Sequence, residues 1–120
     1  VRANAVGVLA DLSKVYPEEL FSDLDRIINL VEDDNEYVQQ NATYALAQIA
    51  EQYPSEVEPA ADVLIDSLEV DSEDTRTSAC RALGYTGATS AVEPLEQRRD
   101  EDPSMDVQQV AGWALGQISE

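Results

Sequence analysis

A short pattern occurs four times in this chain, and this repetition limits the fold more than any other feature of the sequence. The pattern begins at Val1, Val38, Thr75 and Val107, with an alanine at its fifth position each time. Starts 37, 37 and 32 residues apart are typical of solenoids, which stack similar supersecondary units. We predict one domain over residues 1–120, with repeats at 1–37, 38–74, 75–106 and, in part, 107–120.

Each repeat is predicted to contain two helices. In its first segment, apolar or small residues occupy positions 1, 5, 8, 9 and 12, which gather on one face of a helix. The second segment of repeats one and two also has apolar residues at helical spacing, and no segment alternates like a strand. The fold class is therefore all-α. We expect first-type helices near 1–15, 38–52, 74–86 and 105–119, and second-type helices near 17–32, 55–70 and 89–99.

The two helices of a repeat are separated by a break. Pro17 and Pro54 each follow a tyrosine, and proline ends one helix while suiting the first turn of the next. Repeat three has Gly84 and Gly87 at this place, and glycine commonly ends a helix. These breaks predict where the first-type helices end.

The segments between repeats, at 32–36, 71–74 and 100–104, are acidic. Clustered carboxylates could hold calcium, but none of these segments has the calcium-loop pattern with its central glycine and closing glutamate. Asp, Asn and Ser also cap helices, and acidic side chains favour the positive N-terminal end of a helix. We therefore predict helix caps here and no metal site.

The pattern Val-x-x-x-Ala-x-x-Ala-Leu after an acidic turn, followed by a second amphipathic helix, resembles the HEAT repeat. The short third unit, at 87–95, resembles the HEAT-like variant named after phycobilisome lyases. The resemblance implies a right-handed α-solenoid of antiparallel helix pairs that acts as a protein-binding scaffold. A basic residue often follows the opening valine in such repeats; Arg2 and Arg76 match this, whereas Gln39 and Gln108 do not.

The ends of the sequence fall inside the repeat pattern. Val1 already occupies a repeat position, and the fourth unit contains only its first helix. We therefore expect a fragment of a longer array. Because solenoids need polar capping repeats, we also expect exposed apolar ends that pair two copies into a homodimer.

The negative charge of the chain is large and dispersed. Asp and Glu number 25 against seven Lys and Arg, giving a net charge of −18. Dispersed acidity with almost no lysine resembles proteins of halophilic archaea, in which salt screens the self-repulsion. The alternative is an acidic platform for a basic partner, for which repeat two, without Lys or Arg, is the best place. The charge opposes nucleic-acid binding.

Residues that could carry catalysis are scarce. The chain has no His and a single cysteine, Cys80, which excludes zinc sites and His-containing catalytic triads from these residues. We therefore expect no catalytic residue, no metal and no cofactor. A lone cysteine suits a reducing compartment, and no membrane or secretory signal is present, so we expect a cytoplasmic protein that does not enter the membrane.

Two sets of residues are candidates for protein binding. Position 7 of the first-type helices lies away from the apolar stripe, so Tyr44 and Trp113 should be partly exposed. The alternative is that they lie over an adjoining repeat, or that the missing second helix of repeat four covers Trp113. The resemblance implies that second-type helices line the concave side of the solenoid. The candidate strip on those helices consists of Arg26, Asn29, Val63, Asp66, Arg98 and Arg99. The alternative for Arg98 and Arg99 is a solvated helix end.

Two functional classes follow from this. The first is a non-catalytic protein-interaction scaffold with an unknown protein partner. The second is a HEAT-like subunit of a lyase or protein-modifying enzyme whose catalytic residues lie elsewhere.

Overall fold

The first-type helices form one layer of the computed structural model, which describes residues 17–119. They are α3 (Glu36–Gln52), α6 (Glu73–Thr86) and α8 (Met105–Ser119). Each begins and ends within two residues of its predicted range, so these three predictions are confirmed. The helix predicted at 1–15 lies outside the described residues.

The second-type segments form the other layer, and each is divided by a change in helical geometry. Repeat one has the 3₁₀-helix η1 (Pro17–Asp23) and α2 (Leu24–Leu30), and repeat three has η4 (Thr89–Ala91) and α7 (Val92–Glu101). Repeat two contains α4 (Pro54–Val57), η2 (Glu58–Ala60), α5 (Ala61–Asp66) and η3 (Ser67–Glu69). These segments begin and end within two residues of the predicted second-type ranges, which are therefore confirmed; the change of helical geometry inside each segment was not predicted.

The change of geometry falls at the same place in every described repeat. Asp23, Ala60 and Ala91 end the 3₁₀ segments with φ/ψ values of −105/6°, −89/1° and −91/−2°. Only repeat two has a proline, Pro59, next to this joint, where it removes one backbone donor. Because the joint recurs without proline, we attribute its position to packing between the layers, which overrides local propensity.

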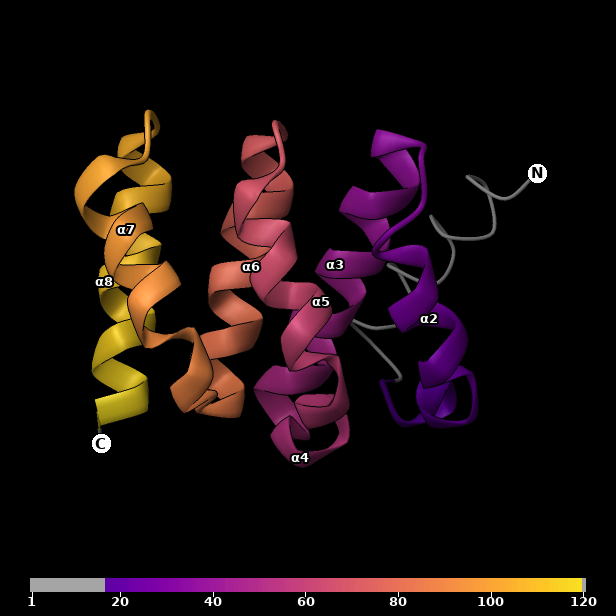
Figure 1. Ribbon diagram of the computed structural model, residues 1–120. Coiled ribbons are helices and arrows are strands. Elements are labelled where there is room, and N and C mark those ends of the chain that lie inside the picture. The colour runs from indigo at the N-terminus through magenta and orange to yellow at the C-terminus, as the bar shows by residue number, and fades with distance from the viewer. Residues whose placement is uncertain (1–16, 120) are drawn as a thin grey trace.

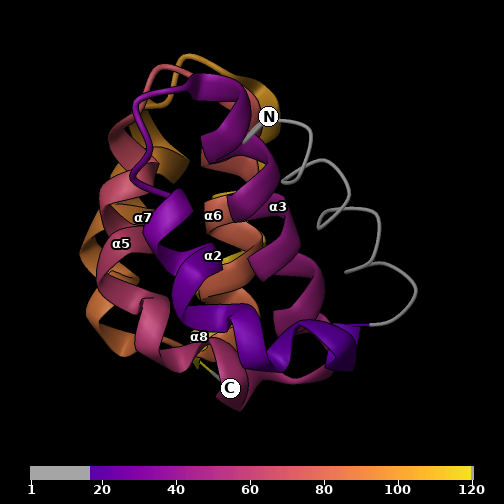
Figure 2. The same ribbon diagram turned by 90° about the vertical axis from the view of Figure 1, so that its right-hand side faces the viewer.

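The repeats stack in chain order, with α6 between α3 and α8 and in contact with both (Figure 1). Figure 2 shows the two layers edge-on, with α2, α5 and α7 in one and α3, α6 and α8 in the other. The surface of each layer is therefore built from equivalent positions of successive repeats.

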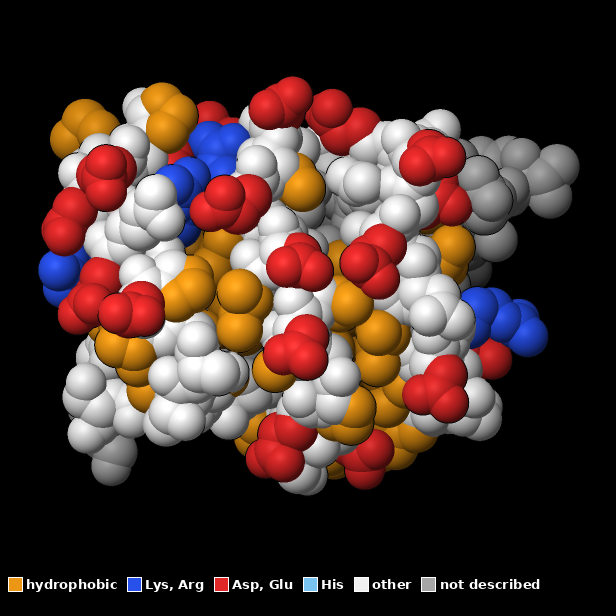
Figure 3. Space-filling view, in the orientation of Figure 1, with side chains coloured by type: hydrophobic (Ala, Val, Ile, Leu, Met, Phe, Trp, Pro, Cys, Tyr) orange, Lys and Arg blue, Asp and Glu red, His pale blue; other side chains and the backbone are white. Residues whose placement is uncertain are grey.

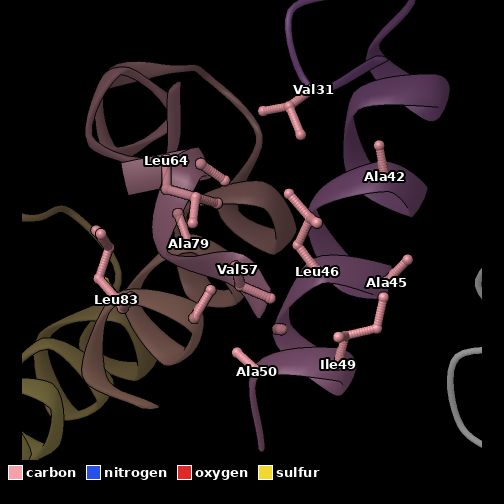
Figure 4. Close-up of a cluster of buried hydrophobic side chains, with 14 of the residues drawn as sticks. Val31, Ala42, Ala45, Leu46, Ile49, Ala50, Val57, Leu64, Ala79 and Leu83 are labelled. Carbon is pink, nitrogen blue, oxygen red and sulfur yellow. The ribbon is translucent and has the colours of Figure 1, made fainter. Parts of the chain in front are cut away.

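The alanine at position 5 is buried in each described first-type helix, as Ala42, Ala79 and Ala111. Figure 4 shows Ala42 and Ala79 in a cluster with larger side chains of both layers, such as Leu46 and Leu64. Small residues at one position and large ones at the next allow close packing without voids.

Side-chain caps begin the first-type helices, as predicted from the acidic segments. The capping oxygens of Asn35, Ser72 and Ser104 accept from the backbone N–H three residues later, at 3.1, 3.2 and 3.3 Å. No group of three or more His, Cys, Asp or Glu side chains within residues 17–119 could hold a metal ion. At the other end of α6, Gly87 has a φ of +69° and closes the helix in the left-handed conformation.

In repeats two, three and four, the side chain at position 2 of the repeat donates a hydrogen bond to the loop before its helix. Gln39 donates to the carbonyl of Asp33, Arg76 to that of Val70 at 3.0 Å, and Gln108 to that of Asp102 at 2.7 Å. In all three cases the acceptor lies six residues back. Glutamine therefore keeps the contact that arginine makes with the loop, without the charge.

Candidate protein-binding surface

Arg98 belongs to a buried ion cluster and not to the exposed strip in which we expected it. Asp102, whose side chain is fully buried, accepts hydrogen bonds from Arg76 Nε at 2.9 Å and from Arg98 NH1 at 3.4 Å. The Ser104 N–H also donates to Asp102 at 2.9 Å. Burial acts to raise the pKa of Asp102, but these hydrogen bonds and the two arginine charges outweigh it and lower that pKa. The cluster holds α6, α7 and the turn before α8 together.

Cys80 lies next to this cluster and is buried. Burial, together with the charge of Asp102, raises the pKa of its thiol to about 12, although Arg98 and Arg76 act in the opposite direction. Reactivity requires the thiolate. Cys80 is therefore a structural residue at neutral pH.

The other residues of the predicted strip differ in exposure and in partners. Arg26, Asn29 and Asp66 are exposed on the second-type layer, whereas Val63 is half-buried. Arg99 is exposed but pairs with its neighbour Asp100 at 2.8 Å. In Figure 3, which faces this layer, acidic side chains are scattered over apolar surface and do not surround a single cationic patch.

The second-type layer also contains an acidic hollow. It has a volume of about 490 Å³ and lies between the repeat-two and repeat-three segments. Its lining residues are Ile65, Asp66, Glu69, Glu93, Pro94 and Gln97. Three carboxylates and no cation line it, so this part of the layer shares the acidity of the whole molecule.

The first-type layer contains two hollows, one on each side of α6. The hollow between α3 and α6 has a volume of about 410 Å³, and the hollow between α6 and α8 about 260 Å³. The first is lined by Tyr37, Gln40, Asn41, Tyr44, Asp74, Thr77, Ser78 and Arg81. The second is lined by Arg81, Tyr85, Gln109, Val110 and Trp113. Because Arg81 lines both, we treat them as one surface and call it the first-helix groove.

Aromatic rings meet Arg81 and one another along this groove. The Arg81 guanidinium carbon lies 5.9 Å from the centre of the Tyr44 ring, within the range of a cation–π contact. Beyond Arg81, the rings of Tyr85 and Trp113 meet edge to face, with centroids 5.0 Å apart and an interplanar angle of 75°. Tyr44, Arg81 and Trp113 all hold position 7 of their repeats.

Gly84 allows Trp113 to take this place. A Cβ atom added to Gly84 would lie 2.7 Å from Trp113 Cζ3 and 3.0 Å from the Ala114 Cα atom. Such distances are too short for a side chain, so only glycine lets α8 and its indole come this close to α6. Trp113 remains 37 % exposed at the rim of the groove.

Exposure at position 7 predicted Tyr44 and Trp113 as candidates, but not the residues that connect them. Arg81 occupies the same repeat position as both, and this shared register was the signal that could have identified it. Tyr85 lies one helical turn after Arg81, and Tyr37, which is 54 % exposed, lies two turns before Tyr44; neither was predicted. The structure thus brings Tyr44, Arg81 and Trp113 together, on the opposite layer from the predicted strip.

The expected pairing through repeat ends remains a prediction. Leu115 and Ile118 of α8 are only partly buried in the structure. No helix within residues 17–119 is long and apolar enough to cross a membrane.

Comparison with known sequences identifies repeats over most of the chain. A profile described as HEAT repeats matches residues 61–120, which is half of the chain, and a second, described as HEAT repeat, matches residues 24–53. No curated protein matches the sequence.

Solved structures of designed and engineered proteins have the same fold. A designed armadillo repeat protein in complex with the peptide (KR)4 is 22 % identical over 97 % of this chain, with a TM-score of 0.85. An engineered protein from a structural genomics consortium is 28 % identical over 98 % of it, with a TM-score of 0.81. This chain spans 57 % of the length of each of these two structures.

Proposed function

We propose that this chain, which belongs to the HEAT repeat family, is a non-catalytic scaffold that binds an extended segment of a partner protein in its first-helix groove. The observation that supports this most directly is the composition of the groove. Arginine and aromatic residues are enriched among the residues that dominate protein interfaces, and here they stand in register on three adjacent helices.

The groove also has the shape needed for a segment of chain. Its two hollows follow one another across α6 and are open to solvent, so a chain can lie along them without the scaffold opening. Amide side chains, including Gln40, Asn41 and Gln109, line the hollows between the aromatic rings. Amides both donate and accept hydrogen bonds, so they suit the backbone of an extended segment.

The second-type layer supports a binding site less well. Arg98 pairs with Asp102 and Arg99 pairs with Asp100. The hollow of this layer is lined by three carboxylates. A scaffold role also fits the inert thiol of Cys80. We therefore place the partner on the first-type layer.

Selection from a random peptide display library would test this proposal. Peptides selected on the wild-type chain should lose about tenfold or more in affinity for Tyr44→Ala and for Trp113→Ser. Asp66→Ser, on the opposite layer, is the matched control and should bind as the wild type does. Circular dichroism checks that each variant is folded. Peptides that bind the groove variants unchanged, or a library that yields no binder, would contradict the proposal.

A further inference from the structure

Arg81 is the one charged side chain at the centre of the first-helix groove. It takes part in no hydrogen bond or ion pair among the residues that the structure describes, and its recorded contact is with the face of Tyr44. A ring beneath the guanidinium leaves the N–H groups at its edge able to donate. The Arg81 side chain is half-buried. It has no carboxylate partner among the described residues, although the chain has 25 Asp and Glu residues.

We propose that Arg81 receives a carboxylate of the partner segment, an Asp or Glu side chain, and that the hollow lined by Tyr85, Val110 and Trp113 takes an apolar side chain next to it. This inference rests on the proposed function, because it assigns the chemistry of the partner at that same groove. The partner is therefore a protein segment with an acidic residue beside an apolar one.

The distribution of charge within the molecule supports this assignment. Of the residues that line the two hollows, only Asp74 is acidic. Asp74 stands seven residues before Arg81, about two helical turns away along α6, and the two do not form an ion pair. The hollow of the opposite layer, by contrast, contains Asp66, Glu69 and Glu93. Negative charge is thus sparse at the place where an incoming carboxylate would lie.

The net charge of −18 opposes an acidic partner only at long range. Exposed charges are screened over about 8 Å at physiological ionic strength, whereas a carboxylate at Arg81 would form its hydrogen bonds in direct contact. Arginine and carboxylate can share two parallel hydrogen bonds, which adds geometric selectivity. The contact pair therefore decides which segment stays bound, even though the molecular charge slows its approach.

The second hollow explains why the neighbouring side chain should be apolar. Tyr85 and Trp113 present ring surface on two sides, and Val110 adds an aliphatic group from α8. No charged residue other than Arg81 lines this hollow. Burying apolar area there contributes affinity, while the carboxylate fixes the register of the segment.

A charge-reversal selection would test the inference. Random peptides are selected in parallel on the wild-type chain, on Arg81→Glu and on Arg26→Glu, which makes the same change on the exposed surface of α2. Wild type and Arg26→Glu should both enrich Asp or Glu beside an apolar residue. Arg81→Glu should instead enrich Lys or Arg at that position. Enrichment of Lys or Arg on the wild type, or the same preference on all three proteins, would overturn the inference.

A double-mutant cycle gives the magnitude of the contact. Changing the acidic residue of the wild-type-selected peptide to the amide should lower the affinity roughly ten- to hundredfold. Arg81→Met in the scaffold, made alone, should lower the affinity for the unchanged peptide by a similar factor. The two changes together should cost little more than either one alone. Additive losses would overturn the inference. If Tyr44→Ala and Trp113→Ser abolish binding while the charge preference does not respond to Arg81→Glu, the scaffold function stands and only the carboxylate assignment falls.

Discussion

Thr75 introduces a hydroxyl group into the core at a position where the other described repeats have valine, Val38 and Val107. Its side chain is buried, and its Oγ1 atom has no hydrogen-bond partner among the described residues. An unsatisfied buried hydroxyl costs about 1–3 kcal/mol, whereas the valine side chain has the same shape without the polar atom. Thr75 is therefore a weak point of repeat three.

We predict that Thr75→Val raises the free energy of unfolding by about 1 kcal/mol. Urea denaturation measures the change through the transition midpoint. Thr43→Val is the control, because Thr43 is equally buried but donates to the Gln39 carbonyl at 2.7 Å. That control should lose about 1 kcal/mol. If Thr75→Val destabilises the protein as much as Thr43→Val does, the Thr75 hydroxyl has a partner after all.

A second prediction at the residue scale concerns Gly84. In Gly84→Ala the new methyl group would lie 2.7 Å from the Trp113 ring, so α8 must move or the ring must turn. We expect a net loss of about 1–3 kcal/mol, because overpacking outweighs the better helix propensity of alanine. Trp113 is the single tryptophan in the sequence, so its fluorescence should report the displacement directly.

Gly116→Ala is the matched control for Gly84→Ala. It lies in the same pair of stacked helices, but a Cβ atom there meets nothing within 4 Å. This variant should be stabilised by up to about 1 kcal/mol and keep the native tryptophan spectrum. Equal stability for the two alanine variants would mean that α6 and α8 are not in close contact at Gly84.

At the scale of helices, periodicity predicted where the segments of both layers lie, but not the joints that divide the second-type segments. The apolar stripes of α3 and α6 end just before Pro54 and Gly87, and these signals are local to each helix. The joints at Asp23, Ala60 and Ala91 have no common local signal, since only one of them follows a proline. They arise from contact between layers, which a single sequence does not display.

The contact between α6, α7 and the turn before α8 depends on Asp102. Its pKa is lowered in the folded protein, so the cluster stabilises the fold fully above the ordinary carboxyl pKa and loses this effect as the pH falls through the lowered value. Asp102→Asn leaves Arg76 and Arg98 without their carboxylate. We predict that this substitution lowers the free energy of unfolding by about 3 kcal/mol at neutral pH.

Unfolding measured at several pH values would test this prediction. The difference in the free energy of unfolding between wild type and Asp102→Asn should be constant near neutral pH and should become smaller below about pH 4. Asp100→Asn is the control, because Asp100 is exposed and pairs with Arg99 on the surface. That variant should leave the free energy of unfolding almost unchanged at any pH, because solvent screens the exposed pair. A constant difference for Asp102→Asn across the acid range would show that the carboxylate charge is not what matters.

Across the whole molecule, the repeat register predicted where equivalent side chains lie but not which of them would form a surface together. Tyr44, Arg81 and Trp113 share position 7 and meet because three first-type helices stand side by side. The pairing of Arg76 and Arg98 with Asp102 could not be predicted, because it depends on how the turn before α8 folds back onto α6. Register therefore predicts the composition of a surface, and tertiary packing decides which of its charges remain available.

The dispersed negative charge leads to the last prediction, which concerns the stability of the molecule as a whole. Acidic side chains are spread over the second-type layer in Figure 3, and carboxylates also occupy the first turns of α6 and α8. Few of them have a cation nearby, so most of the net charge of −18 acts as repulsion within the folded chain. In molar KCl the screening length falls to about 3 Å, and this repulsion is largely removed.

We expect the thermal midpoint to rise by several degrees between dilute buffer and molar KCl, because compaction then costs less electrostatic energy. Choline chloride at the same ionic strength separates screening from specific potassium binding: equal midpoints in the two salts support screening. A midpoint that stays flat or falls with salt would contradict the halophilic interpretation and favour an acidic surface that serves a basic partner instead.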